Sequence, residues 1–273
     1  MTNPIHGQKI THSNRLEGSV VAITGAGSGN GKATALRTGR EGASLYISDI
    51  NAELLEETIG DLKSEGINAQ GGIFDAANID DAPRFVAAVK EVHGRIDVLV
   101  NNAGAVKVEP FPNVSEENWD WTMNLNLKGA FFLMQEAAKP MIDQQSGNIV
   151  NIASIAGTFG GPTSSPSYAA AKAGLVNLTT VAAAVLAQYK IRVNAIAPGI
   201  INTPFHAPVD LAIGQEQLGL APGEHINTRV GLIPLGRLGE PEDVAATVAF
   251  LASEDAAHIS GETITVAGAM RSL

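Results

Sequence analysis

Three residues of this chain have side chains and spacing that suit proton exchange with an oxygen atom. Tyr168 and Lys172 lie four residues apart in an alanine-rich stretch, so a helix would place both on one face with about 6 Å of rise between them. A free tyrosine has a pKa of about 10, and a neighbouring ammonium group lowers it by favouring the phenolate. Tyr168 is then able to exchange a proton with a substrate oxygen. Ser154 is able to donate a hydrogen bond to the same oxygen.

A second group of residues suits the binding of a phosphate. The apolar run 20–23 leads into Thr24-Gly-Ala-Gly-Ser-Gly-Asn-Gly31, and a helix-forming segment follows directly. Glycines let backbone N–H groups approach a ligand closely, and a helix N-terminus adds partial positive charge. The spacing differs from the Gly-x-Gly-x-x-Gly fingerprint, so that motif is not assigned. A glycine-rich surface turn is the alternative.

The kind of nucleotide is indicated by Asp49, at the end of the next apolar run. A carboxylate there accepts hydrogen bonds from both hydroxyls of an adenosine ribose and repels a 2′-phosphate. Neither the glycine turn nor residues 48–52 contain an Arg or Lys that would bind such a phosphate. The sequence therefore favours NAD over NADP. The alternative is that Asp49 only caps the following helix.

The segments that would position these residues alternate between apolar runs and helix-forming stretches. Strands are expected at 20–24, 44–49, 68–74, 96–100, 147–153, 191–197 and 262–266. Helices are expected at 32–40, 52–65, 83–93, 118–138, 167–189 and 240–252. This alternation predicts an α/β fold with a doubly wound, Rossmann-type sheet of about seven parallel strands and helices on both faces.

Polar or glycine-containing clusters follow the first six of these strands. They are Thr24-Gly25, Asp49, Asp75, Asn101-Asn102, Ser154 and Pro198-Gly199. Because ligands of such sheets bind beyond the carboxyl ends of the strands, we expect these clusters to form one site.

We predict a single domain over residues 16–273, because no repeat, low-complexity tract or linker interrupts the pattern. Residues 1–15 show no periodicity and are expected to form a flexible arm. His6 and His12 in this arm have no Cys, Asp or Glu close by, so we expect no metal site. Residues 202–231 contain several prolines and glycines and are too long for a plain connection, which predicts a flap over the substrate.

The composition restricts the possible partners. The formal net charge of -10 argues against nucleic acid and anionic membrane surfaces. The chain has no cysteine, so disulfides and thiolate chemistry are excluded. The N-terminus lacks the pattern of a signal peptide, and we expect no apolar run long enough to span a bilayer. These features predict a cytoplasmic protein that acts on a small molecule.

Five motifs occur along the chain in the following order: Thr24–Gly31, Asn101-Asn-Ala-Gly104, Ser154, Tyr168-Ala-Ala-Ala-Lys172 and Pro198-Gly199. Together they resemble the short-chain dehydrogenase/reductase family, in its compact single-domain branch. The resemblance extends from about Leu16 to about Val266. It implies an NAD-dependent oxidoreductase that interconverts a secondary alcohol and a ketone by hydride transfer.

The resemblance also implies roles for single residues. Tyr168 would be the acid/base, Lys172 would lower its pKa and hold the nicotinamide ribose, and Ser154 would bind the reacting oxygen. Asn126 would hold a water that links Lys172 to solvent, with Asn124 as the competing candidate. The cofactor contacts it implies are Gly25, Gly27, Ser28, Asn30, Gly31, Asp49, Asp75, Ala76, Asn102, Ala103, Gly104, Tyr168, Lys172, Pro198, Gly199, Ile201 and Thr203. It further implies a homotetramer in which the helix 167–189 packs against its symmetry mate.

Several alternatives stay open. One is a nucleotide-binding sensor without turnover, which would not need the full Ser154, Tyr168 and Lys172 set. Another is a carbonyl reductase of the same family that prefers NADP. Enoyl reduction is disfavoured, because relatives with that chemistry have a wider gap between the tyrosine and the lysine. The substrate is not indicated; the side chains that could line its pocket are Phe159, Phe205, His206 and Leu218.

Overall fold

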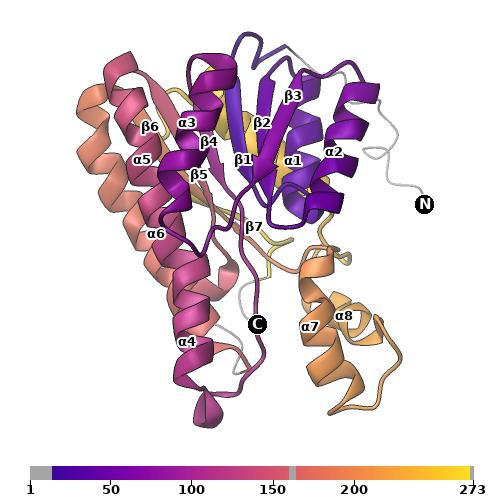
Figure 1. The fold of residues 1–273 in the computed structure, drawn as a ribbon. Coiled ribbons are helices and arrows are strands. Elements are labelled where there is room, and N and C mark those ends of the chain that lie inside the picture. The colour runs from indigo at the N-terminus through magenta and orange to yellow at the C-terminus, as the bar shows by residue number, and fades with distance from the viewer. Residues whose placement is uncertain (1–13, 160–163, 271–273) are drawn as a thin grey trace.

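A parallel β-sheet of seven strands forms the centre of the described part of the chain (Figure 1). This computed structural model describes residues 14–159 and 164–270, so most of the predicted arm, with His6 and His12, lies outside it. The strands are β1 Val20–Thr24, β2 Ser44–Asp49, β3 Ala69–Ile73, β4 Val98–Asn101, β5 Gly147–Ile152, β6 Ile191–Pro198 and β7 Thr263–Val266. Their order is β3-β2-β1-β4-β5-β6-β7, and every pairing is parallel. The predicted sheet is confirmed.

Helices cover both faces of the sheet, as Figure 1 shows. On one face lie α1 Gly29–Arg40, α2 Ala52–Ser64 and α9 Pro241–Ala252; on the other lie α3 Asp81–His93, α5 Gly129–Gln144 and α6 Pro166–Leu186. Ile23 and Val100 pack into the first core, and their neighbours Ala22 and Leu99 pack into the second. Successive side chains of a strand point to opposite faces, so continuously apolar strands fill both cores.

The strand order reverses between β1 and β4, where ligands bind in sheets of this type. Asn102, directly after β4, holds the two strand ends together. Its side-chain amide donates to the carbonyl oxygens of Thr24 at 2.9 Å and Gly25 at 2.8 Å. In return, the Thr24 hydroxyl accepts from the backbone N–H groups of Asn102 and Ala103, both at 3.1 Å. Reciprocal hydrogen bonds therefore fix the ends of β1 and β4 relative to each other, at the point where the strand order reverses.

The helix expected at 118–138 is longer and is interrupted. It begins as α4 Glu116–Met123, passes through a π-helical segment at Asn124–Lys128 and continues as α5 to Gln144. Gly129, the first residue of α5, packs so closely on the chain after β3 that a Cβ there would lie 1.7 Å from the carbonyl oxygen of Ala76. A wider π turn is common at functional positions, and hydrophobic periodicity does not reveal it.

Among the described residues, one helical stretch, Pro166–Tyr189, is long and apolar enough to cross a membrane by length and composition alone, because an 18-residue window within it has a mean hydropathy of 1.5. The expectation that no apolar run reaches this length is therefore wrong. Its composition has another explanation, because α6 packs along β6, α4 and α5 and buries polar and charged side chains such as Tyr168 and Lys172. An apolar helix of this kind serves the core of a sheet protein equally well.

Residues 202–231 consist mainly of short helical turns and not of an open loop. They include α7 Ala207–Val209, a π-helical segment at Asp210–Gln215 and α8 Glu224–Thr228. The Asp210 carboxylate accepts hydrogen bonds from the Gly223 N–H at 2.8 Å and the Gln215 amide at 3.1 Å, which ties the segment to itself. In Figure 1 this segment and α4 extend beyond the sheet at the same edge. Its movement as a flap stays a prediction.

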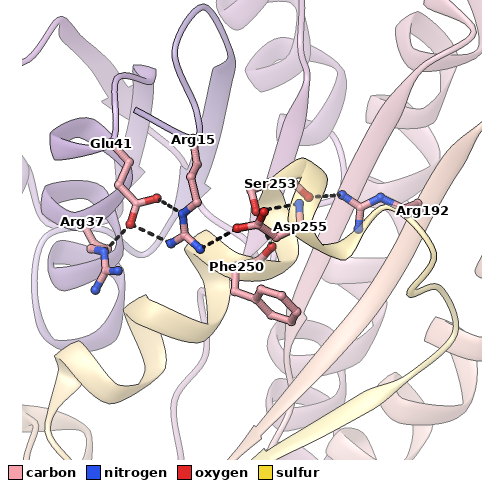
Figure 2. A network of polar contacts seen from close by, with 7 residues as sticks. All are labelled: Arg15, Arg37, Glu41, Arg192, Phe250, Ser253 and Asp255. Atoms are coloured by element: carbon pink, nitrogen blue, oxygen red, sulfur yellow. Dashed lines mark hydrogen bonds and ion pairs between the residues drawn. The ribbon is translucent and has the colours of Figure 1, made fainter. Parts of the chain in front are cut away.

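A partly buried network of charges joins the start and the end of the domain (Figure 2). Arg15 donates two hydrogen bonds to the Glu41 carboxylate, at 2.8 and 2.9 Å, and a third to Asp255 at 3.2 Å. Arg37 of α1 donates to the same Glu41 carboxylate at 2.5 Å. Beside them, Arg192 of β6 donates to the carbonyl oxygen of Ser253 at 3.2 Å. Residues 240 positions apart in the sequence are thus linked directly.

Candidate active site

A cavity of about 680 Å³ lies at the carboxyl edge of the sheet. Its walls come from the segments that follow β1 to β6, from α6 and from the segment 202–231. The predicted cofactor residues all line it except Gly27 and Gly31, and so do Ser154, Tyr168 and Lys172. Of the candidate substrate contacts, Phe205 and His206 line it, whereas Phe159 and Leu218 do not. The sequence motifs thus converge on one cavity.

The glycine turn forms a close-packed cradle at the N-terminus of α1. Gly25 has a φ of +64°, and a Cβ there would lie 2.9 Å from the Cα of Ala103. A Cβ on Gly31 would lie 2.1 Å from the carbonyl oxygen of Gly25. α1 begins at Gly29, three residues before the predicted start, and its N-cap Ser28 makes no side-chain cap hydrogen bond. The cradle therefore fits a phosphate at the positive end of a helix.

Asp49 buttresses this cradle from the end of β2. Its Oδ2 accepts from the backbone N–H of Gly27, and its Oδ1 accepts from that of Asn51, both at 2.9 Å. The cap of α2 is Asn51, whose side chain accepts from Leu54, so the capping alternative for Asp49 is wrong. Lys32, the first basic residue after the glycine turn, forms ion pairs with Glu57 and Asp61.

The chain after β6 closes over the same turn. A Cβ on Gly29 would lie 3.2 Å from the methyl carbon of Thr203, so this threonine packs directly on the start of α1. Ile201 forms an isolated parallel bridge with Gly239 that holds the segment in place. Asn30 lines the cavity, and its Oδ1 is buried with no hydrogen-bond partner in the described structure.

Ser154, Tyr168 and Lys172 meet where β5 ends beside the first turns of α6. Tyr168 is buried and hydrogen-bonded to Ser154, whose Oγ also accepts from the Ala156 N–H at 3.1 Å. Lys172 is 3 % exposed; its Nζ lies 5.7 Å from the centroid of the Tyr168 ring and donates to the carbonyl oxygen of Ile152 at 2.9 Å. The hydroxyl groups of Tyr168 and Ser154 and the ammonium group of Lys172 are thus concentrated at one wall of the cavity.

Asn126 lies behind this group, in the π-helical segment, and is 1 % exposed. Its amide nitrogen donates to the carbonyl oxygens of Ala105 at 3.0 Å and Thr122 at 3.1 Å, and its Oδ1 is buried without a partner. A Cβ on Gly104 would lie 2.8 Å from this oxygen and 3.3 Å from Lys172 Nζ. The amide oxygen and the ammonium group therefore approach the same small space, and the choice of Asn126 over Asn124 stays a prediction.

The family is settled by comparison with known proteins. A family model described as short chain dehydrogenase matches residues 19–213. The chain belongs to this family. It is 40% identical over 256 residues to the 3-oxoacyl-(acyl-carrier-protein) reductase FabG of Thermotoga maritima, covering 94% of this chain and 99% of that protein.

Solved structures agree with this family assignment. The dehydrogenase superposes on levodione reductase with a TM-score of 0.88 and 36% identity, covering 93% of this chain and 98% of that one. An actinorhodin polyketide ketoreductase with NADPH gives a TM-score of 0.88 and 33% identity, with 92% and 97% covered. The chain is therefore an NAD(P)-dependent oxidoreductase that acts on hydroxyl and keto groups.

Desolvation dominates the acidities at the dehydrogenase site. Burial raises the pKa of the Tyr168 phenol above its ordinary value, and the hydrogen bond with Ser154 offsets this only in part. Burial also lowers the pKa of Lys172 to about 8. The predicted lowering of the tyrosine pKa by the Lys172 charge stays a prediction, because burial sets the net direction of the Tyr168 shift here. Tyr168 is therefore protonated at neutral pH.

The outer part of the dehydrogenase cavity was not foreseen from the sequence. It is lined by Trp121 of α4 and by Val209, Ile213, Ile226 and Arg229 of the segment 202–231. The last four come from short helices without a clear hydrophobic period. Trp121 lies near the start of a helix, where the sequence predicts only that it packs against neighbouring residues. Tertiary contact alone brings them to the site. Among the described residues, no group of His, Asp and Glu side chains is arranged to hold a metal ion.

Proposed function

We propose that this dehydrogenase interconverts a secondary alcohol and a ketone with NAD, using Tyr168 as the acid/base. The observation that carries the proposal is the buried Tyr168 hydroxyl, hydrogen-bonded to Ser154 on the cavity wall with Lys172 beside it. When bound, the dinucleotide would supply the acceptor or donor of the hydride. The glycine cradle, Asp49 and Thr203 fit such a molecule, because they combine a close backbone approach with hydrogen-bonding side chains.

In the reducing direction, the protonated Tyr168 would donate its proton to the ketone oxygen. Ser154 would donate a second hydrogen bond to that oxygen and stabilise the charge that develops on it. Lys172 would then favour the phenolate that remains, and Asn126 would orient the route by which the proton is replaced. Because burial raises the pKa of Tyr168, alcohol oxidation should become faster as the pH rises above neutral, whereas ketone reduction should not.

The preference for NAD rests on the charges around the adenosine end of the cavity. Asp49 and Asp75 line that end, and the described residues beside them, Ile50, Phe74, Ala76 and Ala77, include no cation. A 2′-phosphate would meet like charge there. The second candidate is an NADP-preferring reductase of the same fold, which the NADPH bound to the polyketide ketoreductase favours. A comparison of kcat/KM with NADH and NADPH distinguishes the two, and equal efficiency contradicts the role given to Asp49.

Tyr168→Phe tests the chemistry directly. Because only the hydroxyl is removed, turnover should fall on the order of 10²–10⁴-fold while the affinity for NADH stays within about twofold. The measurement is NADH oxidation with a panel of ketones, beside a fluorescence titration of NADH. A variant that keeps the wild-type rate contradicts the assignment. A wild-type protein that binds NADH but turns over no alcohol or ketone supports the sensor alternative.

We also propose a homotetramer located in the cytoplasm. α6 leaves Val181 and Val185 more than half exposed on its outer face, and alanines between them allow another helix to approach closely. Burial of this strip against a symmetry mate would remove exposed apolar surface from water. Sedimentation equilibrium should give four times the chain mass of 28.3 kDa, and a monomer mass would contradict the proposal.

A further inference from the structure

The outer part of the cavity contains a cation without an acidic partner. Arg229 follows α8 directly and lines the cavity, and its Nε is buried with no hydrogen-bond partner. Within residues 14–159 and 164–270, no carboxylate forms an ion pair with it. Burial lowers the pKa of the guanidinium, and no neighbouring carboxylate opposes this effect. A buried donor of this kind is costly unless something binds it.

The backbone around Arg229 is fixed and is not a loose surface turn. Ile226 on one side and Ile233 on the other pack against one apolar cluster, which includes Ile155 and Ile200. Ile155 follows Ser154 directly in the chain. The backbone that carries Arg229 is therefore anchored on the same cluster that supports the end of β5, and the residue lines the cavity that Tyr168 also lines.

The other groups in this part of the cavity carry no compensating charge. Val209, Ile213 and Phe205 are apolar, and burial, followed by the nearby charge of Arg229, lowers the pKa of His206 to about 4, so that ring is neutral at pH 7. The acidic lining residues, Asp49 and Asp75, lie at the adenosine end. The outer cavity thus has a net charge of about +1 in a protein whose formal net charge is -10.

We propose that the substrate carries a carboxylate in addition to its hydroxyl or keto group, and that Arg229 binds this carboxylate. The inference rests on the proposed alcohol and ketone chemistry. A guanidinium pairs with a carboxylate through two parallel hydrogen bonds and balances its single charge. A phosphate monoester carries about −1.5 to −2 at neutral pH, which exceeds the charge available.

The aromatic contacts indicate where the carboxylate lies relative to the reacting carbon. The Tyr168 ring is 5.6 Å from the Phe205 ring, which is 5.4 Å from the His206 ring. His206 is the ring that senses the charge of Arg229. Phe205 thus lies between the acid/base ring and the ring that the charge of Arg229 reaches, so we expect a keto or hydroxy acid whose carboxylate is separated from the reacting carbon by several bonds.

The test compares acids with their neutral esters. Levulinate and its two next longer linear homologues are each assayed beside the methyl ester, with NADH and the wild-type enzyme. At least one acid should exceed its ester in kcat/KM by about tenfold or more, and Arg229→Gln should lower this ratio by about tenfold to a hundredfold. Arg229→Lys should retain part of it. Arg84→Gln, which removes a mostly exposed cation from α3, should leave the ratio unchanged.

A binding measurement gives a readout without turnover. Hexanoate titrated into the enzyme–NADH complex should bind the wild type more tightly than Arg229→Gln. An acid-to-ester ratio near one in the wild type, or an equal loss for both forms in the variant, overturns the inference, as does a variant that loses affinity for NADH alone. If the wild type reduces no ketone at all with either dinucleotide, the proposed function fails instead, and hexanoate binding still decides the role of Arg229.

Discussion

Lys172 supplies a charge to the proposed active site but lowers the stability of the folded protein. It is almost fully buried, and burial lowers its pKa from 10.5 to about 8. A shift of one unit corresponds to about 1.4 kcal/mol, so holding the charged form at neutral pH costs the folded state on the order of 3 kcal/mol. The hydrogen bond to the Ile152 carbonyl recovers only part of this cost.

Lys172→Met should therefore abolish turnover and raise the melting temperature of the protein without cofactor by several degrees at pH 7. Between pH 8 and 10.5 the unfolded chain binds more protons at Lys172 than the folded chain, so wild-type stability rises with pH in that window. The advantage of the variant should shrink over the same window. Thermal unfolding followed by circular dichroism at pH 7 and at about pH 10 checks this, and a lower melting temperature at pH 7 contradicts it.

The sequence reveals the inner site residues but not their acidities. Ser154, Tyr168 and Lys172 stand in recognisable motifs, so their convergence on one cavity could be predicted. The spacing of Tyr168 and Lys172 predicts proximity but says nothing about burial, and burial sets the direction of both pKa shifts. Arg229 has no motif at all; its place depends on how α8 packs against Ile155 and its neighbours.

At the scale of an element, the turn between β1 and α1 depends on the absence of side chains. Gly31→Ala would place a Cβ 2.1 Å from the carbonyl oxygen of Gly25, a backbone atom that cannot move without opening the turn. We expect a loss of about 2–4 kcal/mol in the free energy of unfolding and loss of NADH binding. Urea unfolding and a fluorescence titration measure the two effects.

The matched control is Gly60→Ala, in the middle of α2. Nothing lies within 4 Å of a Cβ at Gly60, so this change should stabilise the protein by about 0.5–1 kcal/mol through helix propensity. If both alanine variants changed stability equally, the close packing of the turn would not be the cause.

Elements were easier to predict from the sequence than the irregularities within them. Most of the strands are recognised because they are short apolar runs, although β3 contains Gln70, Gly71 and Gly72, and the observed ends differ from the expected ones by a few residues. The sequence predicts that the helix begins at Lys32, directly after the glycine turn, yet Gly29 and Gly31 belong to its first turn. The π-helical segment and the short helices of 202–231 depend on tertiary contacts, which no local pattern records.

At the scale of the whole molecule, the network around Glu41 holds both ends of the domain (Figure 2). The Glu41 side chain has no exposed surface, and it is enclosed by Arg15 and Arg37. Burial alone raises the pKa of Glu41, but the hydrogen bonds and charges of the two arginines outweigh it, and the pKa lies below its ordinary value of 4.5. The ion pair therefore contributes stability above pH 4.5 and loses it as the pH falls through the lower folded value.

Glu41→Gln should lower the free energy of unfolding by about 2–3 kcal/mol at pH 7, because it removes the carboxylate that pairs with Arg37 and leaves Arg15 with Asp255 alone. The difference from the wild type should disappear under acid conditions. Glu57→Gln removes an exposed partner of Lys32 and should cost no more than about 0.5 kcal/mol. Chemical denaturation at pH 7 and at about pH 2 provides the comparison, and an equal effect of the two changes at pH 7 would contradict a special role for the network.

The π-helical segment Asn124–Lys128 makes the site sensitive to the length of the chain as well as to its side chains. Each residue of an α-helix turns the chain by about 100°, so loss of one residue would restore a regular helix and rotate everything before it relative to α5. Asn126 would then face away from Lys172, although every site residue were still present. An insertion or deletion in this helix is therefore expected to impair the proposed proton transfer through Asn126. A comparison of residue identities alone would overlook this constraint on chain length.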